Sequence, residues 1–406
     1  MIDLSGVRMS GPLEPFAPRF AAELSRQGYV QGSACQQMQL FAHLSRWLAV
    51  EGLMPDALTP SVFERFLEAR RAAGYKNYLR VRPTGLLLRC LRDAGVAPPL
   101  PVVEAPEGPV EVMLSHYLHY LTVERGLSPK YANACARLMR PFLQSRLSRE
   151  GLELERLSGR EVIAFVVEYC RQQGPGVAKD MPSALRSLLG FLHLEGELER
   201  SLVGVVPSIA RWQSASLPKR LESWEVQALL ASCDRQTASG RRSLAVLTVL
   251  WRLGLRVGEV AALQLDDIDW RAGEIVIRGK GSREDRLPLP ADVGERIAAY
   301  LRDGRPESAT GRTVFVRVNA PHGPLGSSGV RGVVTAAGQR AGLVGIHAHR
   351  LRHTAASEML GAGASLPEIG QVLRHRWTKT TAIYAKVDRE ALRTIARCWP
   401  AERGKA

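Results

Sequence analysis

Residues 243–263, with the sequence SLAVLTVLWRLGLRVGEVAAL, decide how the second half of this chain folds. The first part of the stretch, 243–253, is mostly apolar, which is typical of a buried helix. Gly254 is expected to end that helix, because glycine is a weak helix former and a common helix terminator. The residues that follow, 255–263, predict a second, short helix. Arg256 lies at its start between two glycines, where its side chain can project into a cleft.

Downstream of this stretch, the sequence predicts a small antiparallel sheet within a mainly helical domain. Residues 274–278 (EIVIR) and 285–289 (DRLPL) are typical of strands, and the turn between them, 279–282, contains two glycines. These segments therefore predict a β-hairpin. Residues 312–317 (RTVFVR) predict a third strand, and from 329 to about 398 the pattern is helical again.

The first 200 residues have a helical pattern and repeat internally. Three features recur at an offset of 98–101 residues: Gly28 as Gly126, Glu51-Gly52 as Glu150-Gly151, and Gly95 as Gly196. An offset that drifts so little over a whole unit predicts duplication of a four-helix module. Chance similarity between two unrelated helical modules is the alternative.

The predicted organisation is multidomain and mainly α, with two tandem helical modules before an α+β domain that carries the small antiparallel sheet. Five prolines within residues 97–109 cannot continue a helix, so this segment is predicted to be a linker. The expected boundaries are 1–97 for the first module, 98–109 for the Pro-rich linker, 110–200 for the second module, 201–219 for a second linker and 220–406 for the C-terminal domain.

The charge balance of the chain is strongly basic. Lys and Arg total 55 against 40 Asp and Glu, which gives a net charge of +15 and a pI near 10.0. Such a balance is typical of a nucleic-acid-binding protein, although an Arg-rich chain without that partner is the alternative. No apolar run reaches the ~18–20 residues that cross a bilayer, and the N-terminus lacks the pattern of a secretory signal. We therefore expect no membrane partner and a cytoplasmic location.

Two basic positions of the C-terminal domain could carry chemistry, although each has an ordinary structural explanation. Glu259 follows Arg256 by three residues, so a helix would place both on one face, where the carboxylate could hold the guanidinium. A surface ion pair is the alternative. Lys280 is expected at the tip of the hairpin, where a flexible amine could protonate a leaving oxygen. A solvated turn lysine is the more usual case.

A cluster of histidines follows further along the chain. His349 and Arg352 are three residues apart, and such a pair suits a phosphate site, because one group exchanges a proton while the other neutralises charge. His347, His349 and His353 are alternatively candidate metal ligands. However, the chain has no HExxH pattern, and no Cys or carboxylate stands at ligand spacing, so no metal is expected.

The last candidate is a tyrosine in the C-terminal helical region. Ser365 and Pro367 predict the start of a helix that ends near His375. A second helix would then present Tyr384, nine residues after His375. Taken alone, Tyr384 would more often be a half-buried core residue.

Together, six of these residues resemble a known active site: Arg256, Lys280, His349, Arg352, His375 and Tyr384. In identity, order and predicted element they resemble the active site of the tyrosine recombinases, the phage-integrase family that includes Xer, Cre and lambda-type integrases. The resemblance covers about residues 217–390. Residues 110–200 resemble the helical core-binding domain that precedes the catalytic domain in this family, whereas the module at 1–97 is additional to the minimal family layout.

The resemblance implies a site-specific recombinase or integrase that cuts and rejoins double-stranded DNA, typically for a mobile element. It also implies that no metal, ATP or other cofactor takes part, because the site's own cations supply the charge. The implied roles are Tyr384 as nucleophile in a 3′-phosphotyrosyl link, Arg256 and Arg352 as phosphate clamps, Lys280 as general acid for the 5′-oxygen, His349 as acid/base, His375 as a hydrogen-bond partner of the phosphate, and Glu259 as support for Arg256.

Three positions depart from the family's usual pattern or add charge beside it. Arg350 stands where the family commonly has an acidic or amide residue, and Arg374 stands where it commonly has glycine. Both, together with Arg376, are expected to add positive charge near the phosphate. Further DNA contacts are expected from a basic run of the first module: Arg70, Arg71, Lys76, Arg80 and Arg82. A solvated helix face is the alternative for this run.

The resemblance further implies assembly as a homotetramer on two DNA sites, with or without partner recombinases, and association with the nucleoid when DNA is bound. Residues 388–399 predict a short amphipathic helix that would dock into a neighbouring protomer. Packing of this helix onto its own domain is the alternative. A monomeric type IB topoisomerase and a catalytically silent DNA-binding protein are the alternatives. The intact set of six residues argues against the latter.

Overall fold

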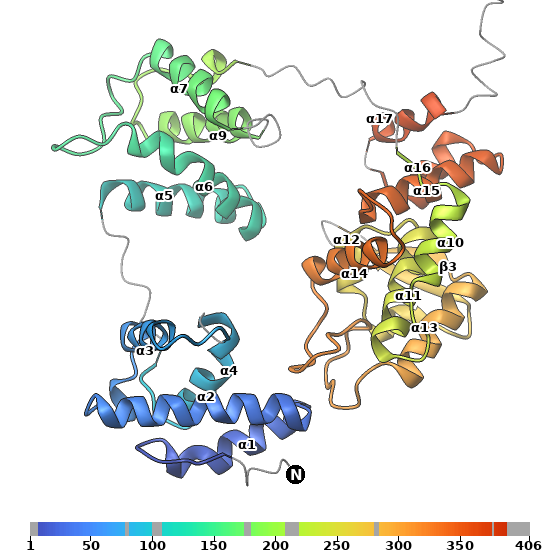
Figure 1. The fold of residues 1–406 in the computed structure, drawn as a ribbon. Helices are drawn as coiled ribbons and strands as arrows, with labels where there is room; N and C mark the ends of the chain where they lie inside the picture. Colours follow the sequence, from blue (N-terminus) through green and yellow to red (C-terminus); the bar gives the residue numbers. More distant parts are fainter. Residues whose placement is uncertain are drawn as a thin grey trace, which may run out of the picture. The chain divides into compact units, whose positions relative to one another are not determined.

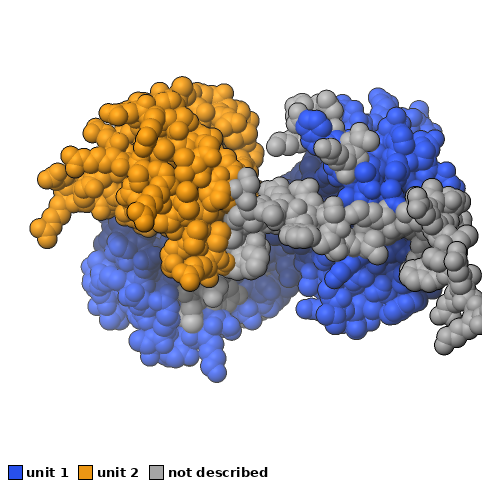
Figure 2. Space-filling model, turned by 90° about the horizontal axis from the view of Figure 1, so that it is seen from above, with its two compact units in different colours: residues 1–99, 214–406 blue, residues 100–213 orange. Residues whose placement is uncertain are grey.

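The computed structural model describes residues 7–77, 81–99, 108–173, 180–207, 219–279, 284–375 and 377–387. Within these ranges the chain is mainly helical and carries a three-stranded antiparallel sheet (Figure 1). This confirms the predicted fold class. The chain divides into two compact units, which Figure 2 shows in different colours: residues 1–99 with 214–406, and residues 100–213.

The first helical module has a hydrophobic core of its own. Phe20 stacks on Phe41 with 4.9 Å between the ring centroids, and Phe63 and Phe66 of the third helix are also buried in this core. Thr59 begins that third helix, because its side chain accepts a hydrogen bond from the backbone N–H of Val62. The elements of the module are η1 (Glu14–Phe16), α1 (Ala17–Arg26), α2 (Gln31–Val50), η2 (Pro55–Ala57), α3 (Pro60–Ala72) and α4 (Val81–Asp93).

The second helical module also closes around its own core, in which Tyr117 and Phe191 lie 5.4 Å apart. Ser158 and Glu161 form a capping box that starts its third long helix. The described elements are α5 (Pro109–His119), the π-helical turn η3 (Tyr120–Glu124), α6 (Pro129–Gln144), α7 (Gly159–Gln172), α9 (Met181–Leu194) and η4 (Val203–Val205).

The two modules match at the start of their third long helix and at three turns. The third helix begins with a hydroxyl cap in both copies, Thr59 in the first and Ser158 in the second. The turns of both copies contain glycines with positive φ at matching places: Gly28 and Gly126, Gly52 and Gly151, Gly95 and Gly196. The duplication itself stays a prediction. The domain boundaries themselves stay predictions.

The C-terminal domain is built around α11, whose interior residues from 244 to 250 are all buried. Thr237 caps its first turn by accepting from the backbone N–H of Gly240 at 3.0 Å. The elements of the domain are α10 (Ser223–Ala231), α11 (Ala238–Arg252), α12 (Val257–Ala262), η5 (Leu265–Asp267), β1 (Ile268–Asp269), β2 (Glu274–Arg278), β3 (Glu284–Pro288), α13 (Ala291–Asp303), α14 (Ser327–Arg340), α15 (Ala348–Gly361), α16 (Leu366–Val372), α17 (Thr378–Thr381) and η6 (Ala382–Val387).

The sheet has the order β1-β2-β3, and β2 pairs with β3 from Glu274↔Pro288 to Arg278↔Glu284. This pairing confirms the predicted hairpin. The prediction of a third strand at 312–317 is wrong, because that segment makes only the isolated bridges Gln264↔Thr313 and Val316↔Pro324. The third strand is instead the short β1, which precedes the hairpin.

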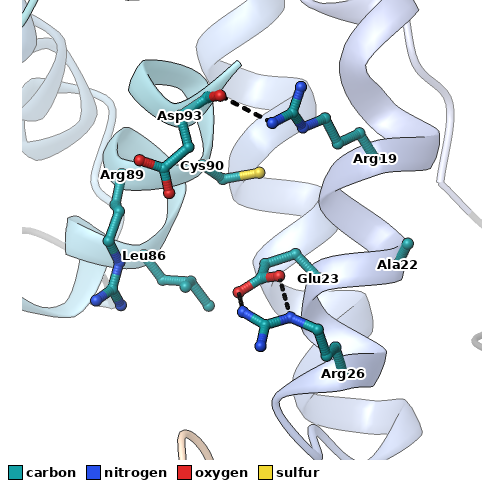
Figure 3. A pocket seen from close by; sticks show the side chains of 8 residues that line it. All are labelled: Arg19, Ala22, Glu23, Arg26, Leu86, Arg89, Cys90 and Asp93. Carbon is teal, nitrogen blue, oxygen red and sulfur yellow. Dashed lines mark hydrogen bonds and ion pairs between the residues drawn. The ribbon is translucent and has the colours of Figure 1, made fainter.

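Among the described residues, no helix is both long and apolar enough to cross a membrane. A cavity of about 260 Å³ lies between α1 and α4 in the first module (Figure 3). Arg19 reaches across it to the backbone carbonyl of Asp93 at 2.9 Å, and Arg26 pairs with Glu23. None of the predicted catalytic residues lines this cavity.

Candidate active site

The site begins where α11 ends. Gly254 has a φ of +57°, in the left-handed region that glycine adopts without strain. A Cβ at this position would lie 2.5 Å from Cδ2 of Leu373, so glycine also allows this close approach. The chain then becomes extended at Arg256, which is the N-cap of α12. The side chain of Arg256 is 46% exposed, and its Nη2 donates to the carbonyl of Arg374 at 3.0 Å.

Glu259 holds Arg256 in place, as the spacing of three residues predicts. Its carboxylate accepts hydrogen bonds from the backbone N–H and from Nη1 of Arg256, both at 2.7 Å. The side chain of Glu259 is only 6% exposed. Burial tends to raise its pKa, but the charge of Arg374 and the hydrogen bonds from both arginines outweigh that effect, so the pKa lies below its ordinary value. Glu259 is therefore a buried, charged support.

Arg352 lies on α15 and connects segments that are distant in sequence. Its Nη1 donates to the carbonyl of Gly254, and its Nη2 donates to the carbonyl of Leu373. The residue is 2% exposed. Burial, followed by the nearby charge of Arg256, lowers its pKa to about 10, so it remains protonated at neutral pH. One guanidinium thus fixes the end of α11 and the end of α16 against α15.

Two histidines of α15 lie beside Arg352. The rings of His349 and His353 are 4.3 Å apart in an edge-to-face arrangement, as expected for residues one helical turn apart. Burial and then the charge of Arg352 lower the pKa of His349. Burial and then the charge of His349 lower the pKa of His353 to about 4. Both imidazoles are therefore neutral at pH 7.

Tyr384 is presented by the 3₁₀ turn η6 and is 1% exposed. Its hydroxyl lies 2.9 Å from Nδ1 of His353. Burial raises its pKa to about 12, against the opposing influence of Arg352. The ring of His375 lies parallel to the phenol ring, with 6.5 Å between centroids. The phenol is thus surrounded by a guanidinium and imidazoles.

His375 follows α16, whose N-cap Ser365 forms a capping box with Glu368, as the sequence predicts for this helix start. Nδ1 of His375 lies 2.8 Å from the hydroxyl of Thr381. Burial, then the charges of Arg352 and Arg256, lower its pKa to about 4. A neutral imidazole with Nδ1 bonded in this way keeps Nε2 for another partner.

Arg374 has a backbone conformation that explains why the family commonly has glycine there. Its φ is +55°, in the left-handed region that costs a residue with a Cβ about 1–2 kcal/mol. Its side chain is 6% exposed and donates to Glu259 at 2.7 Å. The interpretation of Arg374 as a DNA contact does not fit this placement, because its guanidinium is buried against a carboxylate. One carboxylate, Glu259, thus serves both Arg256 and Arg374.

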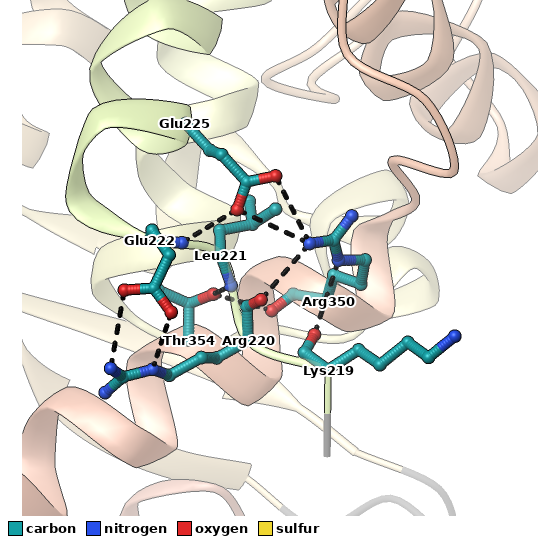
Figure 4. Close-up of polar contacts among 7 residues, drawn as sticks. All are labelled: Lys219, Arg220, Leu221, Glu222, Glu225, Arg350 and Thr354. Carbon is teal, nitrogen blue, oxygen red and sulfur yellow. Dashed lines mark hydrogen bonds and ion pairs between the residues drawn. The ribbon is translucent and has the colours of Figure 1, made fainter. Parts of the chain in front are cut away.

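Arg350 is likewise engaged within the protein (Figure 4). It forms an ion pair with Glu225, and the two side chains are only 14% and 15% exposed. It also donates to the backbone carbonyls of Lys219 and Arg220, while the backbone N–H of Leu221 donates to Thr354 of the same helix. Arg350 therefore fastens the start of the C-terminal domain onto α15, and the interpretation as a DNA contact does not fit.

The basic run of the first module contains one arginine that is bonded within the protein and others that are exposed or lie outside the described residues. Arg70 is 8% exposed, lies over the ring of Tyr75 at 4.2 Å and contacts Nδ1 of His43 at 2.8 Å, so it is part of the module's packing rather than a free cation. Arg71 and Lys76 are exposed. Lys280, Arg80, Arg376 and the side chain of Arg82 lie outside the described residues.

The arrangement offers no ready metal centre within the described part of the chain, where no group of three or more His, Cys, Asp or Glu side chains is placed to hold an ion. What the described residues bring together is Arg256, Glu259, His349, Arg352, His375 and Tyr384. His353, which the sequence analysis considered only as a candidate metal ligand, also belongs to the site. Its position directly after Arg352 was the available signal, but spacing alone did not show that its ring reaches Tyr384.

Two solved structures of DNA recombinases are similar to this chain in fold. The XerH site-specific recombinase bound to its palindromic DNA substrate matches with a TM-score of 0.56 and 18% identity, over 74% of this chain and 99% of that one. A lambda integrase tetramer bound to a Holliday junction matches with a TM-score of 0.51 and 19% identity, over 66% of this chain and 77% of that one. At these identities the likeness concerns the fold.

Sequence relatives carry the assignment further. The model of the phage integrase family matches residues 219–391. The integrase/recombinase y4rA of Sinorhizobium fredii is 39% identical over 399 residues, covering 97% of this chain and 96% of the relative. The tyrosine recombinase XerC of Oceanobacillus iheyensis is 31% identical over 70% of this chain and 94% of the relative. The chain therefore belongs to the phage integrase family and is a tyrosine-type site-specific DNA recombinase, an enzyme that cleaves and rejoins DNA strands.

Proposed function

We propose that this recombinase cuts each strand by attack of the Tyr384 hydroxyl on the scissile phosphate. The attack leaves a 3′-phosphotyrosyl link and a free 5′-hydroxyl, and it stores the bond energy for rejoining. The observation that carries the proposal is the position of Arg352. Its guanidinium bonds to the carbonyls of Gly254 and Leu373, which brings together the segments that carry Arg256 and His375 beside Tyr384.

The charges of the site suit a phosphodiester. Three guanidiniums, those of Arg256, Arg352 and Arg374, face the single carboxylate of Glu259, so the described part of the site keeps an excess of positive charge. Arg256 and Arg352 would bind the non-bridging oxygens, where charge accumulates in the transition state. Glu259 would keep Arg256 oriented. Arg374 would support Glu259 rather than touch DNA.

The remaining roles are those of proton donors and hydrogen-bond partners. Lys280, which stands between β2 and β3 in the sequence, would protonate the departing 5′-oxygen. His375 would donate from Nε2 to the phosphate, because its Nδ1 is already bonded to Thr381. His349, which lies beside Arg352, would assist as acid or base. No metal or nucleotide cofactor has a role in this scheme.

The direct test is a nicked suicide duplex, from which the short fragment with the freed 5′-hydroxyl diffuses away, so that the strand cannot be rejoined. The site is first found by selecting duplexes that the protein binds from a random-sequence pool. We expect a protein–DNA adduct that resists SDS, and mass spectrometry should find the attached nucleotide on Tyr384. A duplex that is bound tightly but never becomes attached would instead support a catalytically silent binder.

We further propose that the chain acts as a homotetramer on two DNA sites of a mobile element, in the cytoplasm and on the nucleoid. The lambda integrase tetramer on a Holliday junction has the same fold and supports this arrangement. Relaxation of a supercoiled plasmid by the monomer would favour the topoisomerase alternative instead.

Removal of residues 388–406, which lie outside the described residues, tests the assembly. Residues 388–399 have an amphipathic pattern that would be marginal as an isolated helix, so its stability would come from packing onto a neighbour. We expect the shortened chain to bind a single site normally but to lose the two-duplex complex on native gels and to lose strand exchange. Normal synapsis by the shortened chain would show that this segment does not link protomers.

The first helical module would extend the DNA footprint, because it repeats the unit found in the second. We expect the full-length variant with Arg71, Lys76, Arg80 and Arg82 all changed to Gln to bind DNA with a weaker salt dependence. Each lost phosphate contact lowers the slope of log K against log salt by about 0.9. The measurement is a titration at several salt concentrations.

The control is Arg26→Gln with Arg65→Gln, which removes two exposed cations of the same module that lie outside the basic run. This control should change the slope less per charge removed. If the fourfold variant leaves the slope unchanged, the module contacts protein rather than DNA.

A further inference from the structure

The buried hydroxyl of Tyr384 has a specific partner, and that partner is a histidine outside the six residues discussed above. Nδ1 of His353 lies 2.9 Å from the hydroxyl oxygen, and the two rings meet edge to face with 5.6 Å between centroids. His353 is part-buried on α15, directly after Arg352. Any reaction of the hydroxyl therefore starts from this contact.

The direction of this hydrogen bond follows from the two groups. Burial keeps the phenol protonated, since its pKa is about 12. His353 is neutral, because burial and then the charges of His349, Arg352 and His347 lower its pKa to about 4. A neutral imidazole accepts through one nitrogen, so the hydroxyl donates its proton to Nδ1 of His353.

Other basic groups near the phenol are less well placed. Nδ1 of His375 is bonded to the hydroxyl of Thr381. Arg352 is a cation whose terminal nitrogens donate to two carbonyls, so it cannot take a proton. His349 contacts the ring of His353, and no hydrogen bond joins it to Tyr384 among the described contacts.

We propose that His353 is a catalytic residue of this recombinase: its Nδ1 takes the proton of the Tyr384 hydroxyl as the phenol oxygen attacks the scissile phosphate. This inference rests on the proposed role of Tyr384. The new bond joins the phenol oxygen to phosphorus, and the bond from phosphorus to the 5′-oxygen breaks. The phenol proton moves to Nδ1, and the 5′-oxygen receives a proton from the general acid. In rejoining, the departing phenol takes its proton back from Nδ1.

The charges around His353 make this proton transfer dependent on substrate. The cation of Arg352 lowers the basicity of the imidazole in the free protein. A bound phosphodiester supplies the negative charge that compensates this cation, so the basicity of His353 rises when DNA occupies the site. The buried phenol would then lose its proton only when a phosphate is present to attack.

The test compares His353→Asn with His353→Ala in the full-length protein. The amide oxygen of Asn can imitate Nδ1 as a hydrogen-bond acceptor but cannot take a proton. Cleavage is measured in single turnovers on the nicked duplex between pH 5 and pH 10, and DNA affinity and melting temperature are measured in parallel. His322→Asn is the control for a histidine outside the site, because Nδ1 of His322 donates to the carbonyl of Arg317 at 3.0 Å and contacts none of the proposed catalytic residues.

We expect His353→Asn and His353→Ala to bind DNA normally and to cleave about 10²–10⁴-fold more slowly, the range typical of a lost general base. The wild-type rate should rise with pH as His353 loses its proton and then level off. The His353→Asn rate should keep rising toward pH 10, because the phenol must then ionise by itself. His322→Asn should behave as wild type.

Two further measurements separate a base from other roles. A 5′-bridging phosphorothioate replaces the leaving oxygen with sulfur, and it should not rescue His353→Asn, because the defect lies at the nucleophile. Fluorotyrosine at position 384 lowers the pKa of the phenol and should recover part of the lost rate in His353→Asn while changing the wild type little. The same comparison in His353→Gln serves if the Asn variant folds poorly.

Wild-type cleavage by His353→Asn would overturn the proposal and leave His353 as a residue that merely holds Tyr384. Rescue by the phosphorothioate would overturn it too, because His353 would then act on the leaving group. These results differ from a failure of the proposed function, in which an adduct would still form on Tyr384→Phe.

Discussion

Changing Tyr384 to Phe should abolish the SDS-resistant adduct on a nicked duplex while leaving DNA binding nearly intact. Only one hydroxyl is removed, and without it no oxygen is positioned to attack the phosphate. Loss of a catalytic nucleophile commonly costs about 10⁶-fold, so the adduct should fall below detection. The measurement is an SDS gel with labelled DNA, read beside a binding titration.

The same substitution also removes the hydrogen bond between the buried hydroxyl of Tyr384 and His353. Its loss should cost about 1 kcal/mol of unfolding free energy, enough for a small shift in melting temperature. Tyr300→Phe is a useful control, because it removes another buried tyrosine hydroxyl, one that accepts from the backbone N–H of Val316 at 3.2 Å. An adduct that persists in Tyr384→Phe would assign the nucleophile to another residue.

Changing Lys280 to Ala should slow cleavage of an ordinary duplex by about 10²–10⁴-fold, the usual contribution of a general acid. A substrate with sulfur at the 5′-bridging position should restore most of that rate, because a thiolate leaves without being protonated. The measurement is single-turnover cleavage of the two substrates by wild type and variant.

Arg256→Ala provides the comparison for Lys280→Ala. The exposed guanidinium of Arg256 would stabilise the non-bridging oxygens, which the sulfur substitution does not change. We therefore expect much less rescue for Arg256→Ala. Equal rescue of both variants would contradict the assignment of Lys280 as the acid.

The sequence predicts those features of the fold and site that depend on residues a few positions apart in the chain. The i,i+3 relation of Arg256 and Glu259 and the helix start at Ser365 are present as predicted. The failure at 312–317 has a different origin. A strand forms only where a second segment pairs with it over several residues. Residues 312–317 pair with other segments at isolated bridges only, such as Gln264↔Thr313. Local β-propensity does not contain that information.

The arginines show a second limit. In the sequence, Arg350 and Arg374 cannot be distinguished from arginines that bind phosphate. In the structure, each is buried against a carboxylate that lies 115–125 residues away in the chain. Composition predicts a basic protein correctly, yet the partner of each guanidinium depends on tertiary structure. The same holds for His353, whose contact with Tyr384 spans 31 residues.

The carboxylate of Glu259, shared between Arg256 and Arg374, constrains the order in which this site can change over evolution. If Arg374 is replaced with Gly before Glu259 changes, the strain of the left-handed backbone at 374 is removed and Glu259 stays paired with Arg256. Losing Glu259 first would leave a buried guanidinium without its counterion, which typically costs about 3–5 kcal/mol. Lineages should therefore pass through glycine at 374 before position 259 varies, and the two positions should covary among descendants.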